Sequence, residues 1–221
     1  MEISTSLLNV EENKIVQTIY DLEVAHTDYF HIDVMDGRFV ENDTSEKMRK
    51  YCEYLNQITN IPIDVHFMVS NIKEYIDSYV IFNPHILTFH YEACKNKEEV
   101  NQFINYIKEY DCKVGLAIKP NTSIEEIKTF LPRINMLLIM SVEPGKGGQK
   151  FIESTISKIE EAKKIIDELE LETEIEVDGG INLENAKQVK EVGTTIAVAG
   201  TSIINSKDYK YTIKNMKSVK N

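Results

Sequence analysis

Two patterns of apolar residues alternate along the chain. Short runs rich in Ile, Val and Leu are followed by longer stretches in which Ile and Leu recur every three or four positions among Glu and Lys. The first pattern predicts buried strands and the second predicts amphipathic helices. We predict eight strands, over residues 2–8, 29–34, 63–68, 86–90, 113–118, 136–141, 174–178 and 196–199. The clearest helices are expected over residues 10–22, 101–110, 124–131, 152–170 and 183–191. Thr122 and Asn182 are expected to cap the third and the last of these helices.

The order of these segments predicts the fold. Strands that alternate with helices form a parallel sheet with right-handed crossovers, and eight such repeats close a (β/α)8 TIM barrel. The alternative, an open doubly wound sheet, typically carries GxGxxG after its first strand, and STSL at residues 4–7 supplies no such turn. We therefore predict an α/β fold of the (β/α)8 TIM barrel class. Because no Pro/Gly/Ser-rich linker interrupts the chain, we expect one domain over residues 1–221.

Polar side chains stand at the ends of three predicted strands. His31 and Asp33 are two residues apart, so they face the same side of their strand. His66 lies late in the third strand, and Asp178 ends the seventh. Catalytic groups of TIM barrels project from the C-terminal strand ends, so these four side chains are expected to converge. Two imidazoles and two carboxylates suit one divalent metal ion, Zn²⁺, Fe²⁺ or Mn²⁺.

Alternatively, each of these four residues is a structural polar side chain in the barrel lining, and neighbouring groups satisfy its hydrogen bonds. Four such groups at matching strand ends favour the metal site, because buried carboxylates without a cation are costly.

Glycine-rich segments follow the last three predicted strands. They are PGKGGQ at residues 144–149, Gly179-Gly180, and Gly200-Thr201-Ser202. The loops after the last strands of such barrels often bind a phosphate, and glycine lets backbone N–H groups approach the anion. We expect a phosphate to be held there mainly by backbone amides. Lys146 is either an additional cation or a solvated loop residue.

Methionines and further histidines also lie near strand ends. The methionines at the ends of the second, third and sixth strands fill the core or form an apolar wall around the site: Met35, Met68 and Met140. His90 ends the fourth strand and either lines the site or is structural. His26 and His85 precede strands, and we expect them to be structural.

The composition restricts the partners. A formal net charge of −11 disfavours nucleic acid and anionic membranes. The three cysteines form no CxxC pair, no basic segment precedes an apolar run at the N-terminus, and the apolar run at residues 136–142 is far too short for a bilayer. We expect a soluble, cytoplasmic protein that binds a small molecule and neither nucleic acid nor membrane. A homo-oligomer is compatible with this composition.

Five motifs together resemble those of the ribulose-phosphate 3-epimerase family. They are HIDVMDG at residues 31–37, DVH at 64–66, MSV at 140–142, PGKGGQ at 144–149 and EVDGGIN at 176–182. The resemblance runs in order from Ser6 to about Ser202. It implies a metal-dependent interconversion of D-ribulose 5-phosphate and D-xylulose 5-phosphate, a sugar-phosphate conversion of the pentose phosphate pathway.

The resemblance also implies the roles of single residues. His31, Asp33, His66 and Asp178 match the family's metal ligands, and Asp33 and Asp178 match its acid and base. The matching substrate-binding positions are Ser6, His66, Gly145, Lys146, Gly147, Gly148, Gly179, Gly180, Gly200 and Thr201.

Four positions depart from the family's pattern. Glu41 replaces a usual Pro, Glu143 a usual Asn or Asp, Lys146 a usual aromatic residue, and Asn9 a usual Ser. Because these loops are expected to flank the pocket, the length of the sugar stays open. Allulose-6-phosphate 3-epimerases share most of the motifs and bind a longer sugar.

Inverting a carbon next to a ketone requires removing its proton from one face and returning a proton to the other. Asp33 and Asp178 could do this on opposite sides of a planar enediolate if one is ionised and the other is protonated. Two other classes remain as alternatives. A sugar-phosphate aldolase or decarboxylase typically carries Asp-x-Lys-x-x-Asp at a strand end, whereas DVMD at residues 33–36 has no lysine, and a Schiff-base enzyme would depend on Lys119. A non-catalytic sugar-phosphate binder would keep only the phosphate loops.

Overall fold

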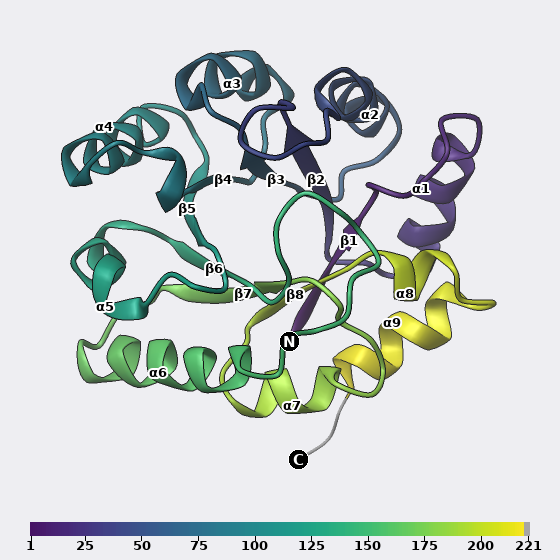
Figure 1. Cartoon of the computed structure of the whole chain (residues 1–221). Helices are drawn as coiled ribbons and strands as arrows, with labels where there is room; N and C mark the ends of the chain where they lie inside the picture. The colour runs from purple at the N-terminus through teal and green to yellow at the C-terminus, as the bar shows by residue number, and fades with distance from the viewer. Residues whose placement is uncertain (219–221) are drawn as a thin grey trace.

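Eight short apolar segments form the strands of a closed parallel barrel in the computed structural model, which describes residues 1–218. The strands follow one another around the barrel in sequence order (Figure 1): β1 (Glu2–Ser6), β2 (Tyr29–Met35), β3 (Ile63–Met68), β4 (Ile86–His90), β5 (Lys113–Ile118), β6 (Met136–Met140), β7 (Glu174–Asp178) and β8 (Ile196–Ala199). The barrel closes where β1 pairs with β8, with Ser4 opposite Val198. This confirms the predicted (β/α)8 TIM barrel.

Helices surround the barrel, as Figure 1 shows. They are α1 (Ile15–Val24), α2 (Ser45–Ile58), α3 (Ile72–Tyr79), α4 (Lys97–Ile107), α5 (Ile124–Ile127), α6 (Thr155–Glu168), α7 (Ala186–Glu191), α8 (Thr201–Ile204) and α9 (Tyr209–Lys217). Within residues 1–218, three short 3-10 helices supplement them: η1 (Val80–Phe82), η2 (Tyr91–Ala93) and η3 (Lys128–Arg133). None of the helices over residues 1–218 is long and apolar enough to cross a membrane.

The core has two layers, because parallel barrel strands are buried on both faces. Outward-facing Ile, Val, Leu and Phe side chains pack against the helices. Inside the barrel, apolar side chains fill the end from which the strands start, among them Tyr29, Ile86, Met136 and Ile196. Further along the same strands, inward positions become polar, as at Asp33 of β2 and His66 of β3, which lie opposite one another. The polar side chains predicted at the strand ends thus lie at this end of the barrel.

Both predicted helix caps are wrong by a few residues. Ser123, and not Thr122, is the N-cap of α5, where it forms a capping box with Glu126. α7 begins at Ala186 behind Asn185. Asn182 instead accepts hydrogen bonds from the backbone N–H groups of residues 184 and 185, so it caps the turn before the helix. Only Ser123 has capping geometry, because the Asn185 side chain makes no cap hydrogen bond to α7.

Several helix boundaries also differ from those that the sequence pattern predicts. The first helix begins at Ile15 rather than at residue 10, because residues 7–14 form turns. The helix predicted over residues 124–131 is α5 followed by η3, which contains Pro132, and a proline lacks the N–H that an α-helix needs. α4 begins at Lys97, four residues early, because Asn96 accepts a hydrogen bond from the N–H of Glu99.

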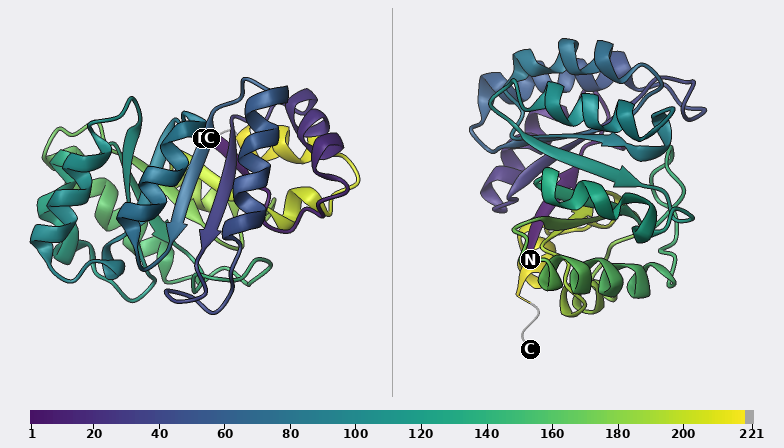
Figure 2. Two further views of the ribbon diagram at one scale, coloured as in Figure 1. Left: turned by 90° about the horizontal axis from the view of Figure 1, so that it is seen from above. Right: turned by 90° about the vertical axis from the view of Figure 1, so that its left-hand side faces the viewer.

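The strands all run toward one end of the barrel, and Figure 2 shows loops protruding beyond their arrowheads. Two of these loops touch each other. Asn42, in the loop after β2, donates a hydrogen bond of 2.6 Å to the carbonyl of Gly145, in the loop after β6. Residues 103 positions apart are therefore joined over the end where the polar side chains gather.

Candidate active site

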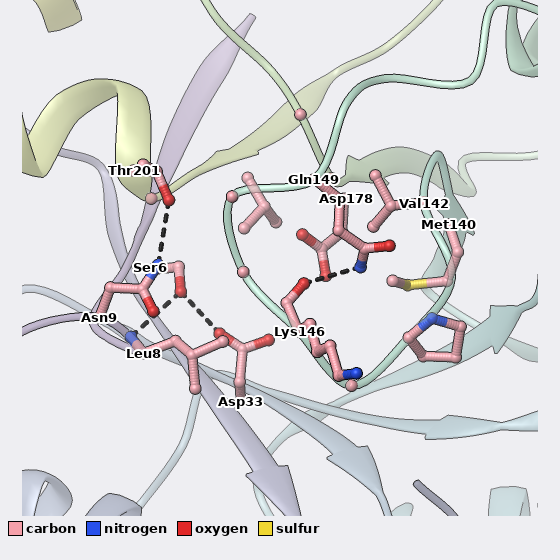
Figure 3. A pocket seen from close by; sticks show the side chains of 18 of the residues that line it. Ser6, Leu8, Asn9, Asp33, Met140, Val142, Lys146, Gln149, Asp178 and Thr201 are labelled. Atoms are coloured by element: carbon pink, nitrogen blue, oxygen red, sulfur yellow. Dashed lines mark hydrogen bonds between the residues drawn. The ribbon is translucent and has the colours of Figure 1, made fainter. Parts of the chain in front are cut away.

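A cavity of about 260 Å³ opens at the C-terminal ends of the strands. Asp33 of β2 and Asp178 of β7 point into it from different sides, and Ser6 of β1 lies next to Asp33 (Figure 3). The glycine-rich loops after β6, β7 and β8 form the rest of its rim. The cavity thus contains the acidic groups and the glycine loops that the sequence singles out.

His31 and His66 converge with Asp33 and Asp178, and of these four residues only the two aspartates are among those that line the cavity. One ligand atom from each lies within 4.8 Å of the others. Asp33 Oδ1 lies 3.5 Å from His31 Nε2 and 3.8 Å from His66 Nδ1. Asp178 Oδ2 lies 3.4 Å from His66 Nδ1 and 3.8 Å from His31 Nε2. The two carboxylates and the two imidazoles therefore surround one small volume.

The two imidazole nitrogens that face this volume are buried. Neither His31 Nε2 nor His66 Nδ1 has a hydrogen-bond partner among residues 1–218. A buried polar atom without a partner is costly, so such atoms need an explanation. Two imidazole nitrogens with two carboxylate oxygens form a donor set that fits a divalent ion such as Zn²⁺, Fe²⁺ or Mn²⁺. These four residues could hold one metal ion.

The electrostatics of the protein without metal follow from the same geometry. Burial would raise the pKa of the Asp33 carboxyl, but the His31 and His66 imidazoles hold that pKa well below its usual value. Burial would lower the pKa of His31, but the Asp64 and Asp33 carboxylates hold it well above its usual value. The pKa of His66 is also raised, because Asp178 and Asp33 outweigh its burial. Protons on the imidazoles balance the carboxylates when no cation is present.

Two buried carboxyl groups lie behind His31, and sequence reasoning missed both. Asp64 Oδ2 lies 2.5 Å from His31 Nδ1 and accepts a hydrogen bond of 2.9 Å from the Ser4 hydroxyl. Glu176 Oε1 lies 3.9 Å from His31 Nδ1. Burial, and then the nearby Asp64 carboxylate, hold the pKa of Glu176 well above its usual value. The signal was present, because Asp64 and Glu176 precede His66 and Asp178 by two residues and so share their inward face.

His90 lies behind His66, and sequence reasoning had left its role open. Its Nε2 is 2.9 Å from His66 Nε2, and its Nδ1 is 3.0 Å from Glu92 Oε2. Burial lowers the pKa of His90 to about 4, which Glu92 only partly offsets. The Phe39 ring lies 5.0 Å from the His90 ring. Glu92 was missed, because it follows its strand in η2 and faces the site only through His90.

The remaining predicted residues lie around the same cavity. Ser6 donates a hydrogen bond of 2.6 Å to Asp33 Oδ2. The other lining residues that the sequence predicted are Met35, Met68, Met140, Gly145, Lys146, Gly147, Gly148, Gly179, Gly180, Gly200 and Thr201. His26 and His85 do not line it; the His85 ring lies near that of Tyr29, at the other end of the barrel.

Two of the positions that depart from the family's pattern lie together. Lys146 Nζ is 3.8 Å from Glu41 Oε2, across the contact between the loop after β2 and the loop after β6. Val40 packs so closely on Gly145 that a Cβ there would lie 3.0 Å from the Val40 Cβ. Glu41 and Lys146 therefore form an exposed ion pair between two loops that are already in contact.

Gly180 has a backbone that only glycine accepts easily, and we predict that Gly180→Ala distorts the rim. Its φ is +68°, and a Cβ there would lie 2.5 Å from the backbone nitrogen of Phe151. Gly148 is the matched comparison, because its φ is +73° but a Cβ added there would lie 3.6 Å from its nearest neighbour. The free energy of unfolding of both alanine variants should fall by about 1–2 kcal/mol, because alanine is strained in a left-handed backbone conformation.

Only Gly180→Ala should lose more stability than this, and it should also raise the KM for a ligand of the glycine loops, by an expected factor of ten or more. Urea unfolding and steady-state kinetics of the two variants measure this difference. Equal losses of stability in both would show that the contact with Phe151 does not matter.

Comparison with known proteins places this site in a family. A sequence profile of the ribulose-phosphate 3 epimerase family matches residues 2–204. The chain belongs to the ribulose-phosphate 3-epimerase family. Ribulose-phosphate 3-epimerase of Bacillus subtilis is 35% identical over 221 residues, which is 100% of both chains. That of Escherichia coli K12 is 34% identical over 220 residues, covering 98% of this chain and 94% of that one.

A chloroplastic ribulose-5-phosphate-3-epimerase from Arabidopsis thaliana is 35% identical over 99% of this chain and 76% of its own length. Among solved structures, a 3-hexulose-6-phosphate synthase has a TM-score of 0.69 at 12% identity, covering 99% of both chains. At that identity the likeness shows the fold alone. Membership in the ribulose-phosphate 3-epimerase family makes this chain an isomerase, an epimerase that acts on carbohydrates.

Proposed function

We propose that this epimerase interconverts D-ribulose 5-phosphate and D-xylulose 5-phosphate, with one divalent metal ion held by His31, Asp33, His66 and Asp178. One observation carries the proposal. Two carboxylates and two buried imidazole nitrogens, the latter without partners among residues 1–218, surround one small volume, and the two carboxylates also line a cavity rimmed by glycine loops. The cavity thus offers a cation site next to acid and base groups, together with amides for a phosphate.

Asp33 and Asp178 would act on a carbon between them. β2 and β7 are separated in the barrel by β1 and β8, so the two carboxyl groups enter the cavity from different parts of its wall. One aspartate would remove the proton from C3 as a base, and the other would deliver a proton to the opposite face. The Ser6 hydroxyl, which donates to Asp33 Oδ2, would keep that carboxyl group turned into the cavity.

The environment supports charge separation in this step. The metal, when bound, supplies a Lewis acid for the negative charge that develops on the substrate oxygens. Met35, Met68 and Met140 line the cavity and would keep bulk water from the carbon that loses its proton. The chain itself contributes the two carboxyl groups and an apolar wall.

The phosphate would be bound at the glycine loops. Gly145, Gly147, Gly148, Gly179, Gly180 and Gly200 line one side of the cavity, where their small size leaves the backbone accessible. A formal net charge of −11 opposes an anionic ligand, so local N–H donors have to provide the binding. Lys146 lines the same rim and pairs with Glu41, so its charge is partly compensated.

The size of the sugar is tested with a substrate panel. We expect metal-loaded protein to convert D-ribulose 5-phosphate with a kcat/KM at least tenfold above that for D-allulose 6-phosphate, a discrimination that one additional carbon commonly produces. Equal or higher kcat/KM for the hexulose phosphate would assign the protein to the alternative activity.

The other chemical classes have less support. Lys119, on which a Schiff-base enzyme would depend, is not among the residues that line the cavity, and its Nζ lies 4.3 Å from the centre of the Phe39 ring. A pure sugar-phosphate binder would need neither of the two aspartates.

We further propose that the chain acts as a single domain in the cytoplasm; the last three residues of the predicted domain, 219–221, lie outside the described part. A homo-oligomer stays a prediction.

A further inference from the structure

His66 contacts two different environments through its two ring nitrogens. Nδ1 faces the carboxylates of Asp178 at 3.4 Å and Asp33 at 3.8 Å. Nε2 faces away from the cavity and lies 2.9 Å from Nε2 of His90. A hydrogen bond between two ring nitrogens contains one proton, so one ring donates and the other accepts. The direction of this bond decides which nitrogen of His66 has a free lone pair.

Glu92 determines the direction. Its Oε2 lies 3.0 Å from His90 Nδ1. Its other oxygen, Oε1, accepts hydrogen bonds from the backbone N–H of Lys119 at 2.7 Å and from the hydroxyl of Thr122. An ionised carboxylate only accepts, so the proton of the neutral His90 ring has to be on Nδ1. His90 Nε2 is then an acceptor, and His66 has to donate from Nε2.

The direction of this hydrogen bond determines which form of His66 Nδ1 faces Asp33 and Asp178. A neutral His66 that donates from Nε2 has its lone pair on Nδ1, the atom that faces Asp33 and Asp178. Only an imidazole nitrogen with a free lone pair binds a metal. We propose that His90 and Glu92 are positioning residues, which fix the tautomer and the ring orientation of His66 so that Nδ1 is the metal ligand. This inference rests on the proposed metal site and assigns a function to two residues that do not line the cavity.

One substitution would move the protons of His90 and His66 to the opposite ring nitrogens without changing the shape of the side chain at position 92. In Glu92→Gln, the amide oxygen has to take the place of Oε1, because the N–H of Lys119 can only donate. The amide NH₂ then points at His90 Nδ1 and donates to it. His90 becomes the Nε2–H tautomer, His66 accepts at Nε2, and the proton of His66 moves to Nδ1. The lone pair that faces the cavity is lost.

The first measurement is the affinity for Zn²⁺, titrated into chelator-treated protein in competition with a coloured chelator. We expect Glu92→Gln to weaken binding by about 10–100-fold, as is usual when a partner behind a histidine ligand is lost. Glu98→Gln, an exposed position on α4, is the control and should bind as the unchanged protein does. Equal affinity of all three proteins would overturn the proposal. Thermal unfolding of the metal-free variants verifies that they are folded.

The second measurement does not depend on any metal. In ¹⁵N-histidine-labelled metal-free protein, two-bond couplings between ring nitrogens and ring protons show which nitrogen of His90 carries a proton. At a pH high enough to leave His66 neutral, we expect Nδ1–H in the unchanged protein and Nε2–H in Glu92→Gln. An Nε2–H tautomer of His90 in the unchanged protein would overturn the inference even if the variant did not fold. If the unchanged protein shows Nδ1–H on His90 but binds no Zn²⁺, the proposed metal site is wrong, whereas the inferred tautomer of His90 is correct.

Discussion

Asp33→Asn and Asp178→Asn should each lower the kcat of epimerisation by at least about 10²–10⁴-fold, the usual contribution of a general acid or base. Asparagine preserves the shape of the side chain and cannot take up or release a proton at physiological pH. The KM should change much less, because the glycine loops that are proposed to bind the phosphate are untouched. Coupled-enzyme assays of D-ribulose 5-phosphate conversion measure both constants.

The two variants should also differ from each other in one respect. If each aspartate serves one face of the substrate, each variant retains the base for one epimer only. With D-ribulose 5-phosphate or D-xylulose 5-phosphate in heavy water, one variant should exchange the C3 proton of the first sugar and the other that of the second. Asp111→Asn, an exposed position before β5, is the control. Near-normal turnover in either site variant would exclude the two-aspartate mechanism.

Those variants also change the proposed metal ligands, so metal content has to be measured alongside. An Asn side chain offers a neutral oxygen ligand in place of a charged one, and metal affinity should fall. The kinetics are therefore to be compared at saturating metal, with the occupancy determined by elemental analysis. A loss of turnover at full occupancy separates the proton transfer from metal binding.

Removing the metal should abolish turnover and lower the melting temperature. A ligand present at about 1,000 times its Kd stabilises the folded state by about 4 kcal/mol, which for a chain of this size is on the order of 10 °C. The structure explains why the loss should be large, because it leaves His31 Nε2 and His66 Nδ1 buried without partners among residues 1–218. Differential scanning calorimetry with and without chelator measures the shift. Full activity after complete removal of metal would contradict metal dependence.

The metal-free protein should also depend on pH in a definite direction. The pKa values of His31 and His66 are raised in the folded state, because carboxylates outweigh their burial. A group whose pKa is raised by folding stabilises the protein fully below its unfolded pKa of about 6.5, and this stability is lost as the pH rises through the folded pKa. Chelator-treated protein should therefore become less stable as the pH rises above about 6.5.

Metal-loaded protein should not show this loss, because the cation replaces the protons and its affinity rises with pH. Melting temperatures measured across this range with and without chelator should thus diverge as the pH rises. Parallel curves would show that the imidazoles do not exchange protons for a cation.

The strand pattern alone predicts much of this site. Because side chains alternate along a strand, His31 and Asp33 had to share a face, and because parallel strands end together, Asp178 had to lie near them. The same alternation applies to Asp64 and Glu176, which lie one layer deeper. Strand-end position does not mark them, because the rule for catalytic groups applies only to the C-terminal ends of the strands.

Other features depend on contacts that no local pattern contains. The hydrogen bond between Asn42 and Gly145 joins two irregular loops about 100 residues apart, and the link from Glu92 to Lys119 joins the loops after β4 and β5. Loop conformations depend on such long-range contacts. The sequence shows that the loops are polar or rich in glycine, but it does not show which atoms meet.

The central claim is that two aspartates epimerise C3 by a proton transfer on each face of the sugar. Its most direct test is a single turnover of D-ribulose 5-phosphate by excess metal-loaded protein in heavy water, with the product examined by ¹H NMR. Two bases require that the new hydrogen comes from a different group than the one that took the old hydrogen. The D-xylulose 5-phosphate formed should therefore carry deuterium at C3, whereas a product that keeps its original proton at C3 would contradict the account.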